Sequence, residues 1–250
     1  LGVLDADLVD EVDDLATRYI AGRHDLFAAR VAAGRARDGH GDLLADDIFC
    51  MEDGPRVLDC LDFADRFRVG DVLADVAFLA MDLERLGRPD LADVFLRDCR
   101  EHAGDAWPAS LAHHHVAYRA QVRAKVAALR AEQGDPGAAA AGTRLLELAA
   151  THLRAARVRL VLVGGLPGTG KSTVAAGVGD AIGAVVLRSD VIRKEIAGLD
   201  AADAAGAPFG EGIYDEAGTD ATYRAMFDQA DTALRMGESV VLDASFTDER

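Results

Sequence analysis

This sequence of 250 residues has few cysteines, few lysines and no long apolar run. The cysteines Cys50, Cys60 and Cys99 are odd in number and lack C-x-x-C spacing, so we expect reduced thiols and a cytoplasmic location rather than disulfides or zinc ligands. No apolar stretch approaches the length of a membrane span, and no charged-then-apolar signal opens the chain. We therefore expect no membrane partner.

Positive charge is also scarce. Lys and Arg total 27 against 43 Asp and Glu, which gives a net charge of −16. Proteins bind nucleic acid largely by neutralising its phosphates with basic side chains, so we expect no nucleic-acid partner. Half of the residues are hydrophobic, which is enough to build a sizeable core in one large or two modest domains.

Helical periodicity dominates the chain up to about residue 156. Residues 5–36 predict helix, and a polar break precedes two strands, Ile48–Met51 and Arg56–Leu58, joined by a turn at 52–55. Residues 133–142, rich in Gly, Pro and Ala, predict a loose connection before a last helix. Two apolar stripes predict buried helix faces: Leu79, Leu83 and Leu86, and then Val122, Val126 and Leu129.

Three consecutive histidines, His113, His114 and His115, fall within this helical region. Neighbouring residues on a helix point in different directions, so the three side chains do not share one tetrahedral metal site. We expect them to form a solvated helix face.

The pattern changes after residue 156. Continuous apolar runs at 160–163, 184–187 and 240–242 are typical of strands buried on both faces of a parallel sheet. Helical segments separate the runs, which predicts a doubly wound α/β domain. We place the domain boundary near residue 156.

A complete P-loop pattern follows the first apolar run. Gly165, Gly170, Lys171 and Ser172 satisfy G-x-x-x-x-G-K-[ST] between a predicted strand and a predicted helix. Glycines let backbone N–H groups face phosphate oxygens, and the helix adds the positive end of its dipole. We expect Lys171 to reach the β- and γ-phosphates of ATP and Ser172 to ligate Mg²⁺. The expected nucleotide-binding residues are Gly165, Leu166, Pro167, Gly168, Thr169, Gly170, Lys171, Ser172 and Thr173.

Acidic residues follow the other two runs. Asp190 and Arg193 are three residues apart, so they share a face at a helix start. The carboxylate suits a general base and the arginine suits an anionic group, but an N-cap aspartate with a solvated arginine has the same spacing. Asp243 ends the third run, where a Walker-B acid stands near Mg²⁺ and where a turn-capping aspartate also occurs.

With these motifs, residues from about 158 to 250 resemble the small P-loop kinases that phosphorylate hydroxyl groups, grouped with zeta-toxin-like and polynucleotide-kinase-like proteins. In the polynucleotide-kinase relatives, a strand-end Asp-x-x-Arg supplies the general base and the arginine that positions the substrate. The resemblance implies these catalytic roles for Asp190 and Arg193. The lid arginine and adenine-binding segment of that family would lie beyond Arg250, so we expect a partial P-loop kinase domain.

A second motif lies in the helical region. His40-Gly41-Asp42 is followed by Asp47, and a predicted hairpin then leads to Asp59. An acidic surface loop between helices would account for the same residues. Of the whole chain's lysines, none precedes Lys125.

This order of residues resembles the catalytic loop of aminoglycoside-phosphotransferase-like kinases. The resemblance implies that Asp42 is a catalytic base and that Asp47 and Asp59 are Mg²⁺ ligands, with Asp71 and Asp75 at the acidic helix start that follows. The sequence departs from that family at position 47, where the family has Asn. The glycine-rich lobe of the family and its phosphate-clamping lysine have no counterpart here, so we expect a piece of a longer, two-module protein.

The predicted fold class is therefore mainly α followed by α/β. Residues 1–135 are expected to be the helical C-terminal lobe of a protein-kinase-like fold, 136–156 a helical connector, and 157–250 a P-loop domain. The predicted activity is ATP- and Mg²⁺-dependent phosphoryl transfer to a hydroxyl group of a small molecule. A nucleotide-binding regulatory module with a degenerate kinase lobe and a zeta-toxin-like nucleotide-sugar kinase are the alternatives, and the acceptor and the oligomeric state stay open.

Overall fold

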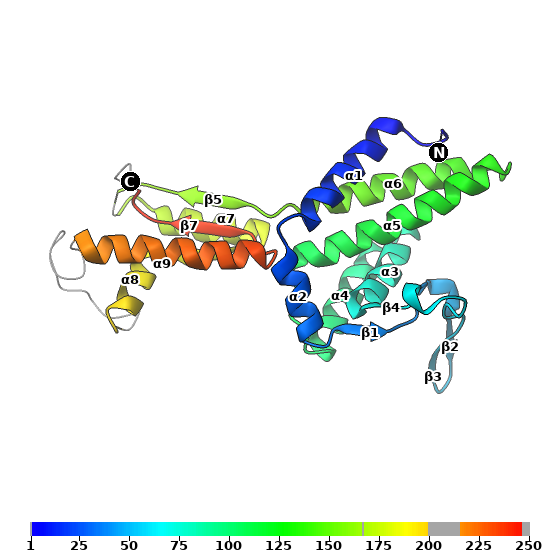
Figure 1. Cartoon of the computed structure of the whole chain (residues 1–250), viewed down its shortest axis with the longest axis horizontal. Helices are drawn as coiled ribbons and strands as arrows, with labels where there is room; N and C mark the ends of the chain where they lie inside the picture. Colours follow the sequence, from blue (N-terminus) through cyan, green and yellow to red (C-terminus); the bar gives the residue numbers. More distant parts are fainter. Residues whose placement is uncertain (1, 167, 200–215, 247–250) are drawn as a thin grey trace. The chain divides into compact units, whose positions relative to one another are not determined.

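The computed structural model describes residues 2–166, 168–199 and 216–246. The chain divides into two compact units, Leu1–Arg157 and Val158–Arg250, each with its own elements (Figure 1). None of the described helices combines the length and the apolar character that crossing a membrane requires.

Helices build most of the first unit. They are α1 (Ala6–Ile20), α2 (His24–Ala32), α3 (Val72–Arg85), α4 (Pro89–His102), α5 (Ala109–Glu132) and α6 (Ala138–Ala155). Two small antiparallel sheets and two single-turn 3-10 helices stand beside them. These are β1 (Ala36–Asp38) with β4 (Val69–Asp71), β2 (Ile48–Met51) with β3 (Gly54–Val57), η1 (Ala45–Asp47) and η2 (Asp65–Phe67).

The core of this unit lies between α1, α3, α5 and α6. Val12, Phe78, Met81 and Val116 are all at most 1% exposed there. Helices α5 and α6 run side by side as a long pair (Figure 1). The pair approaches closely because α5 presents small side chains to the core, and a Cβ built on Gly142 of α6 would already lie 3.4 Å from the carbonyl oxygen of Ala124. Residues 138–155 are thus packed into the first unit.

Several sequence-based predictions for this unit are wrong in detail. The predicted 5–36 helix is broken after Ile20, because Gly22 adopts a φ of +80°, and residues 36–38 form a strand. Residues 138–142 belong to α6 and are not a loose connection, since alanine is the strongest helix former. The hairpin turn contains two residues rather than four, because Gly54 already pairs with Met51.

Side-chain burial corrects two further predictions. Leu129 of the predicted α5 stripe is 45% exposed, while the alanines Ala120, Ala124 and Ala128 are at most 1% exposed. The histidine triplet is not a solvated face: His114 is 8% exposed and stacks on Tyr19, with 4.4 Å between ring centroids. Burial lowers the pKa of His114 to about 3.

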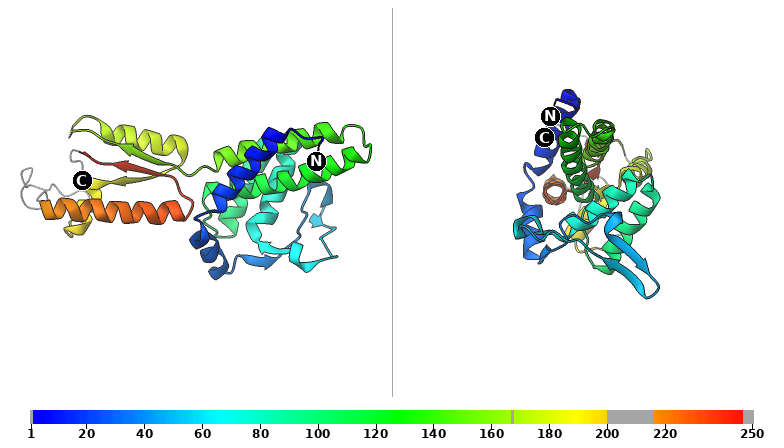
Figure 2. Two further views of the ribbon diagram at one scale, coloured as in Figure 1. Left: turned by 45° about the horizontal axis from the view of Figure 1, so that its top comes forward. Right: turned by 90° about the vertical axis from the view of Figure 1, so that its right-hand side faces the viewer.

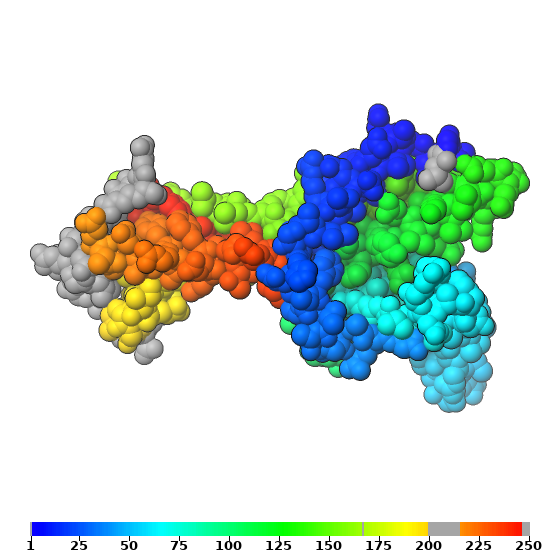
Figure 3. Space-filling view, in the orientation of Figure 1, coloured from blue at the N-terminus to red at the C-terminus, as the bar shows by residue number. Residues whose placement is uncertain are grey.

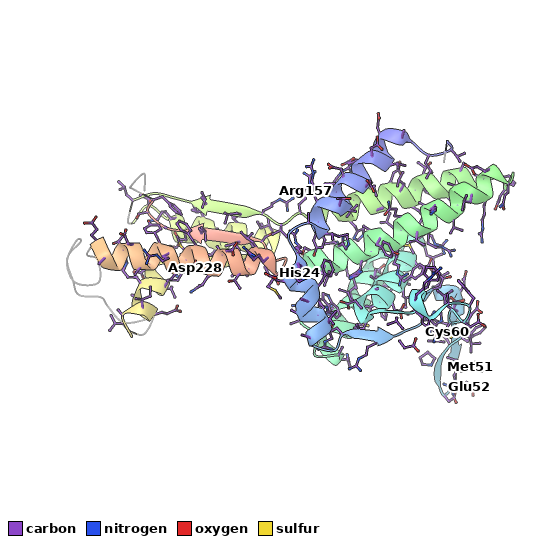
Figure 4. All side chains as sticks on the ribbon, viewed as in Figure 1. His24, Met51, Glu52, Cys60, Arg157 and Asp228 are labelled. Carbon is purple, nitrogen blue, oxygen red and sulfur yellow. The ribbon has the colours of Figure 1, made fainter. Side chains whose placement is uncertain are left out.

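The hairpin of β2 and β3 projects from the helices of the first unit (Figure 3). Met51 and Glu52 lie at its tip (Figure 4). Phe49, Met51 and Val57 are each at least 50% exposed along it, so the hairpin adds little to the core.

The second unit is a parallel α/β sandwich, as the sequence predicts. Its strands β5 (Leu160–Val163), β6 (Val185–Arg188) and β7 (Val240–Asp243) pair in the order β5-β7-β6. Helix α7 (Lys171–Ile182) covers one face, and α8 (Ser189–Ile196) with α9 (Glu216–Arg235) covers the other (Figure 2). All four residues of the central strand β7 are buried for this reason, which matches the continuous apolar run at 240–242 and leaves Asp243 as its one buried polar side chain.

Candidate functional site

The carboxyl ends of the three parallel strands meet at one edge of the sheet. In register, Asp243 of the central strand pairs with Val163 on one side and with Arg188 on the other. The P-loop leaves β5 at this edge, and α8 leaves β6 there. Open α/β sheets bind ligands outside the carboxyl ends of their strands, so this edge is the candidate site.

The P-loop backbone is held open by glycines. Gly165, Gly168 and Gly170 adopt φ values of +150°, +78° and +85°, which side-chain-bearing residues rarely adopt. A Cβ on Gly165 would also lie 3.3 Å from Thr169 Oγ1. Helix α7 begins directly after Gly170, so its first N–H groups and its dipole face the loop. Such a loop and helix start suit an anionic phosphate chain.

Polar side chains close the loop on itself. Lys171 Nζ donates a hydrogen bond to the carbonyl oxygen of Leu166 at 3.1 Å, and Thr169 Oγ1 donates to the same oxygen at 2.7 Å. The ammonium group thus lies over the loop. Pro167, which completes the predicted loop, lies outside the described residues.

Ser172 and Asp243 form the polar centre of the edge. Ser172 Oγ donates to Asp243 Oδ2 at 2.6 Å, and Asp243 is 4% exposed. Arg188 lies against both groups, with Nη2 3.4 Å from Ser172 Oγ and Nε 3.5 Å from Asp243 Oδ2. The guanidinium places a positive charge beside two oxygens that are suited to a hard cation. Arg188 was not among the predicted site residues; its place as the last residue of β6, two positions before Asp190, is the signal that would have identified it.

These observations bear on the family of the second unit. Residues 160–250 match the family described as AAA domain. The segment is therefore a P-loop NTPase-like domain of a family that includes kinases. The match covers the P-loop, α7 and the central strand.

Three curated relatives match nearly the whole chain. They come from Mycobacterium bovis and from two strains of Mycobacterium tuberculosis, and each is described as an uncharacterized protein. Each is 44% identical over 246 residues, which is 98% of this chain and 49% of the relative. The chain thus spans about half the length of the curated relatives it matches. No solved structure shows significant similarity to it.

Asp190 and Arg193 of the AAA domain both lie on α8, but they contact different groups. Asp190 is in the first turn, with its side chain 52% exposed and Oδ2 3.5 Å from Lys194 Nζ. Arg193 Nη1 donates to Thr219 Oγ1 of α9 at 3.2 Å. Arg188, not Asp190, is the N-cap residue of α8. The accessible carboxylate at the sheet edge is available to a ligand.

A tyrosine on α9 fixes the chain after the central strand. Tyr223 Oη accepts a hydrogen bond from the backbone N–H of Phe246 at 3.1 Å and lies 3.3 Å from Ser245 Oγ. The carbonyl oxygen of Ser245 in turn accepts from the N–H of Gly165 at 3.3 Å. Tyr223 therefore supports the start of the P-loop through one intervening segment. Tyr223 was not among the predicted site residues, because nothing in the local sequence connects it to a loop 58 positions away.

In the first unit, Asp75 shapes the His40-Gly41-Asp42 loop. Its Oδ2 accepts from the N–H of His40 at 2.6 Å, and its Oδ1 accepts from the N–H of Gly41 at 2.9 Å. Gly39 precedes the loop, and any Cβ there would overlap the Asp75 carboxylate. The ring of His40 is fixed by a 2.7 Å hydrogen bond between Nε2 and the carbonyl oxygen of Leu58.

Asp42 is half-buried at the end of this loop. Burial raises the pKa of Asp42, and the nearby Arg123, with Nη1 3.9 Å from Oδ2, opposes that rise. Asp47 Oδ2 accepts instead from the N–H of Leu44 at 3.3 Å, and Asp59 is exposed with a φ of +65°. Within 2–166, 168–199 and 216–246, no group of three or more His, Cys, Asp or Glu side chains is arranged to hold a metal ion.

Proposed function

We propose that the whole protein transfers the γ-phosphoryl group of ATP to a hydroxyl group of a small molecule, and that the AAA domain binds the nucleotide. The observation that carries this proposal is the joint geometry of the sheet edge. Loop amides and Lys171 face the space outside β5, and Ser172 and Asp243 meet 2.6 Å apart at its base. Few arrangements other than a triphosphate site need all of these groups together.

The residues at the base of the loop fit a magnesium ion. Ser172 Oγ and the buried Asp243 carboxylate are oxygen donors, which Mg²⁺ prefers, and two protein ligands are typical of sites that also use nucleotide phosphates. Mg²⁺ held there would neutralise charge on the β- and γ-phosphates. Arg188 has to give up its contacts with Ser172 and Asp243 when the cation binds.

The remaining roles follow from the positions of the side chains. Lys171 exchanges the Leu166 carbonyl oxygen for phosphate oxygens, and the loop amides hold the same phosphates. Asp190, exposed at the same edge, accepts the proton of the acceptor hydroxyl, and Arg193 positions the acceptor. Most of the rate then comes from positioning and charge stabilisation rather than covalent chemistry by the protein.

The test is Lys171→Ala in the full-length protein. A panel of hydroxylated metabolites, with nucleotide sugars included, is incubated with Mg-ATP, and both ATP consumption and phosphorylated product are measured. We expect product with the wild type and its loss with Lys171→Ala, because the charge on the γ-phosphoryl group is no longer neutralised. The control is Lys125→Ala, an exposed lysine on α5 that belongs to neither candidate site. Unchanged transfer by Lys171→Ala would assign the chemistry to another site.

We infer that the first unit is the helical lobe of an aminoglycoside-phosphotransferase-like module, with Asp42 as base and Asp47 and Asp59 as metal ligands. The Asp75-bound His40-Gly41-Asp42 loop supports this inference. The matching relatives are about twice as long, which leaves room for a second lobe in the whole protein. Loss of product with Asp42→Asn, while Lys171→Ala keeps it, would place catalysis in this unit.

A regulatory module is the second candidate function. The described part of the first unit shows no cluster of three or more His, Cys, Asp or Glu side chains that could hold a metal ion. The Asp47 carboxylate already accepts a hydrogen bond from the Leu44 N–H. In that case ATP would bind at the AAA domain and change how the domains pack, with little phosphoryl transfer. Tight Mg-ATP binding without any phosphorylated product across the acceptor panel would favour the regulatory function.

A further inference from the structure

A cavity of about 260 Å³ lies between α3 and α6 of the first unit. It is lined by Glu84, Arg85, Ala141, Arg144, Leu145 and Leu148. It shares no residue with the P-loop site or with the His40-Gly41-Asp42 loop. Small-molecule pockets usually run from roughly 300 to 1,000 Å³, so this cavity lies just below that range and suits only a small ligand.

A partly buried chain of hydrogen bonds holds Glu84 in place. Glu84 Oε2 lies 2.9 Å from His152 Nε2, and His152 Nδ1 lies 2.9 Å from His113 Nδ1. An ionised carboxylate only accepts, so His152 donates from Nε2 and, when neutral, accepts from His113 at Nδ1. Burial lowers the pKa of His113, which keeps that ring neutral. The chain orients one carboxylate oxygen and leaves Oε1 with no partner among the residues that the structure describes.

The two arginines of the cavity differ in what they bind. Arg85 Nε donates to the buried Asp82 carboxylate at 2.7 Å, so its charge is already neutralised. Arg144 is exposed and makes no ion pair or hydrogen bond within the described part of the chain. The cavity therefore offers one oriented carboxylate oxygen and one guanidinium group without a partner.

Apolar side chains complete the lining. Leu145 is 6% exposed and packs into the core of the unit, while Leu148 and Ala141 are half-buried beside it. All three lie on α6 together with Arg144. The apolar surface and the two opposite charges thus share one small space.

We propose that this cavity binds a small zwitterion with a compact apolar body, of the class of free aliphatic amino acids. The ammonium group of the ligand binds Glu84 Oε1, its carboxylate binds Arg144, and its side chain packs on Leu145 and Leu148. A simple carboxylic acid would turn an apolar or negative end toward Glu84, and a simple amine would leave Arg144 without an anion. Only a ligand with both charges pairs both groups, which makes the site selective.

The experiment is calorimetric titration of the 250-residue chain with L-leucine, L-valine, L-isoleucine and L-methionine. Two matched analogues of leucine remove one charge each: 4-methylpentanoate lacks the ammonium group and 3-methylbutylamine lacks the carboxylate. We expect at least one of the amino acids to bind at a single site, and both analogues to bind about tenfold more weakly or worse, since a charged hydrogen bond is lost in each case. No binding by any of the four amino acids at millimolar concentration, or equal binding of leucine and 4-methylpentanoate, overturns the proposal.

Two variants connect the binding to the cavity. Arg144→Gln removes an exposed charge, so it leaves the fold intact, and we expect it to weaken binding of the best amino acid about tenfold or more. The control is Arg100→Gln, an exposed arginine on α4 outside the cavity, which should bind like the wild type. Wild-type affinity in Arg144→Gln overturns the proposal. The titrations contain no nucleotide, so their outcome does not depend on phosphoryl transfer.

Discussion

A substitution of Asp190 is the most direct single-residue test of whether the edge of the sheet carries out the proposed phosphoryl transfer. Its carboxylate is half-exposed, lies 3.5 Å from Lys194 Nζ and follows the strand β6 that ends beside Asp243. If Asp190 is the base, Asp190→Asn removes the proton acceptor and leaves the nucleotide cradle unchanged. We expect kcat to fall by roughly 10²–10⁴-fold with little change in the KM for ATP.

The control for that change is Asp180→Asn, an exposed aspartate on α7 of the same unit. Steady-state kinetics on the acceptor found in the metabolite screen would measure both variants. An Asp190→Asn enzyme with the wild-type kcat would show that this carboxylate takes no part in the reaction and would leave it the contact with Lys194 that the described residues show.

Two histidines of α5, the buried His114 and the partly buried His115, predict how stability depends on pH. Burial lowers the pKa of His114 to about 3 and that of His115 to about 4, and one ring nitrogen of each has no partner among the described residues. The unfolded chain protonates these rings near pH 6.5, so below that pH it binds more protons than the native state does. Stability therefore falls as the pH drops from 6.5 toward 4, by about 2 kcal/mol per histidine at pH 5.

Urea unfolding at several pH values between 7.5 and 5 measures this loss. His115→Gln removes one of the two titrating rings, so its stability should depend less steeply on pH than that of the wild type. His24→Gln serves as the control, because that ring is almost fully exposed on α2. Equal slopes for His115→Gln and the wild type would show that His115 titrates alike in the folded and unfolded chains.

At the scale of elements, the close pair of α5 and α6 depends on small side chains. Ala124 is 1% exposed, and its backbone carbonyl lies next to Gly142 on α6. Ala124→Leu forces the two helices apart or the new side chain into a poor rotamer, at a cost of about 1–3 kcal/mol. Denaturant unfolding should show this loss, whereas Ala109→Leu, at an exposed position of the same helix, should have little effect.

The sequence predicted some elements well because their physical signal is local. The run at 240–242 is continuous and apolar since helices cover both faces of the central strand, and the glycines of the P-loop are needed by its backbone alone. The expected burial on both faces is wrong for 160–163, because β5 is an edge strand of the described sheet and its Leu160 and Leu162 are more than half exposed. The contact between Ser172 and Asp243 was also foreseeable, because parallel strands bring their carboxyl ends to one edge.

Other features depend on partners far away in the chain. The buried face of α5 is made of alanines. The predicted buried face used large apolar residues instead, so the prediction that Leu129 is buried was wrong. The burial of His114 depends on Tyr19, 95 residues earlier. The chain that joins Glu84, His152 and His113 needs three helices in their final places. Tertiary packing rather than local pattern decides such cases.

At the scale of the whole molecule, the two units have separate hydrophobic cores, and the described cores differ in how much apolar surface they bury. The first contains a continuous core across α1, α3, α5 and α6. The described core of the second is smaller, and Leu160 and Leu162 of β5 remain more than half exposed. Less apolar burial per residue means less stability, so we expect the second unit to unfold at the lower temperature.

Nucleotide should then stabilise only one of the two units. A ligand that binds the native state alone adds RT ln(1 + [L]/Kd), which is about 2.7 kcal/mol at a concentration of 100 Kd. With Mg-ATP, amide hydrogen exchange should slow in 160–199 and 216–246 and stay unchanged in 6–155, and Lys171→Ala should abolish the effect. Equal slowing in both units would mean that they unfold as one cooperative body. Slowing confined to 6–155 would place the nucleotide at the His40-Gly41-Asp42 loop and reverse the roles assigned to the two units.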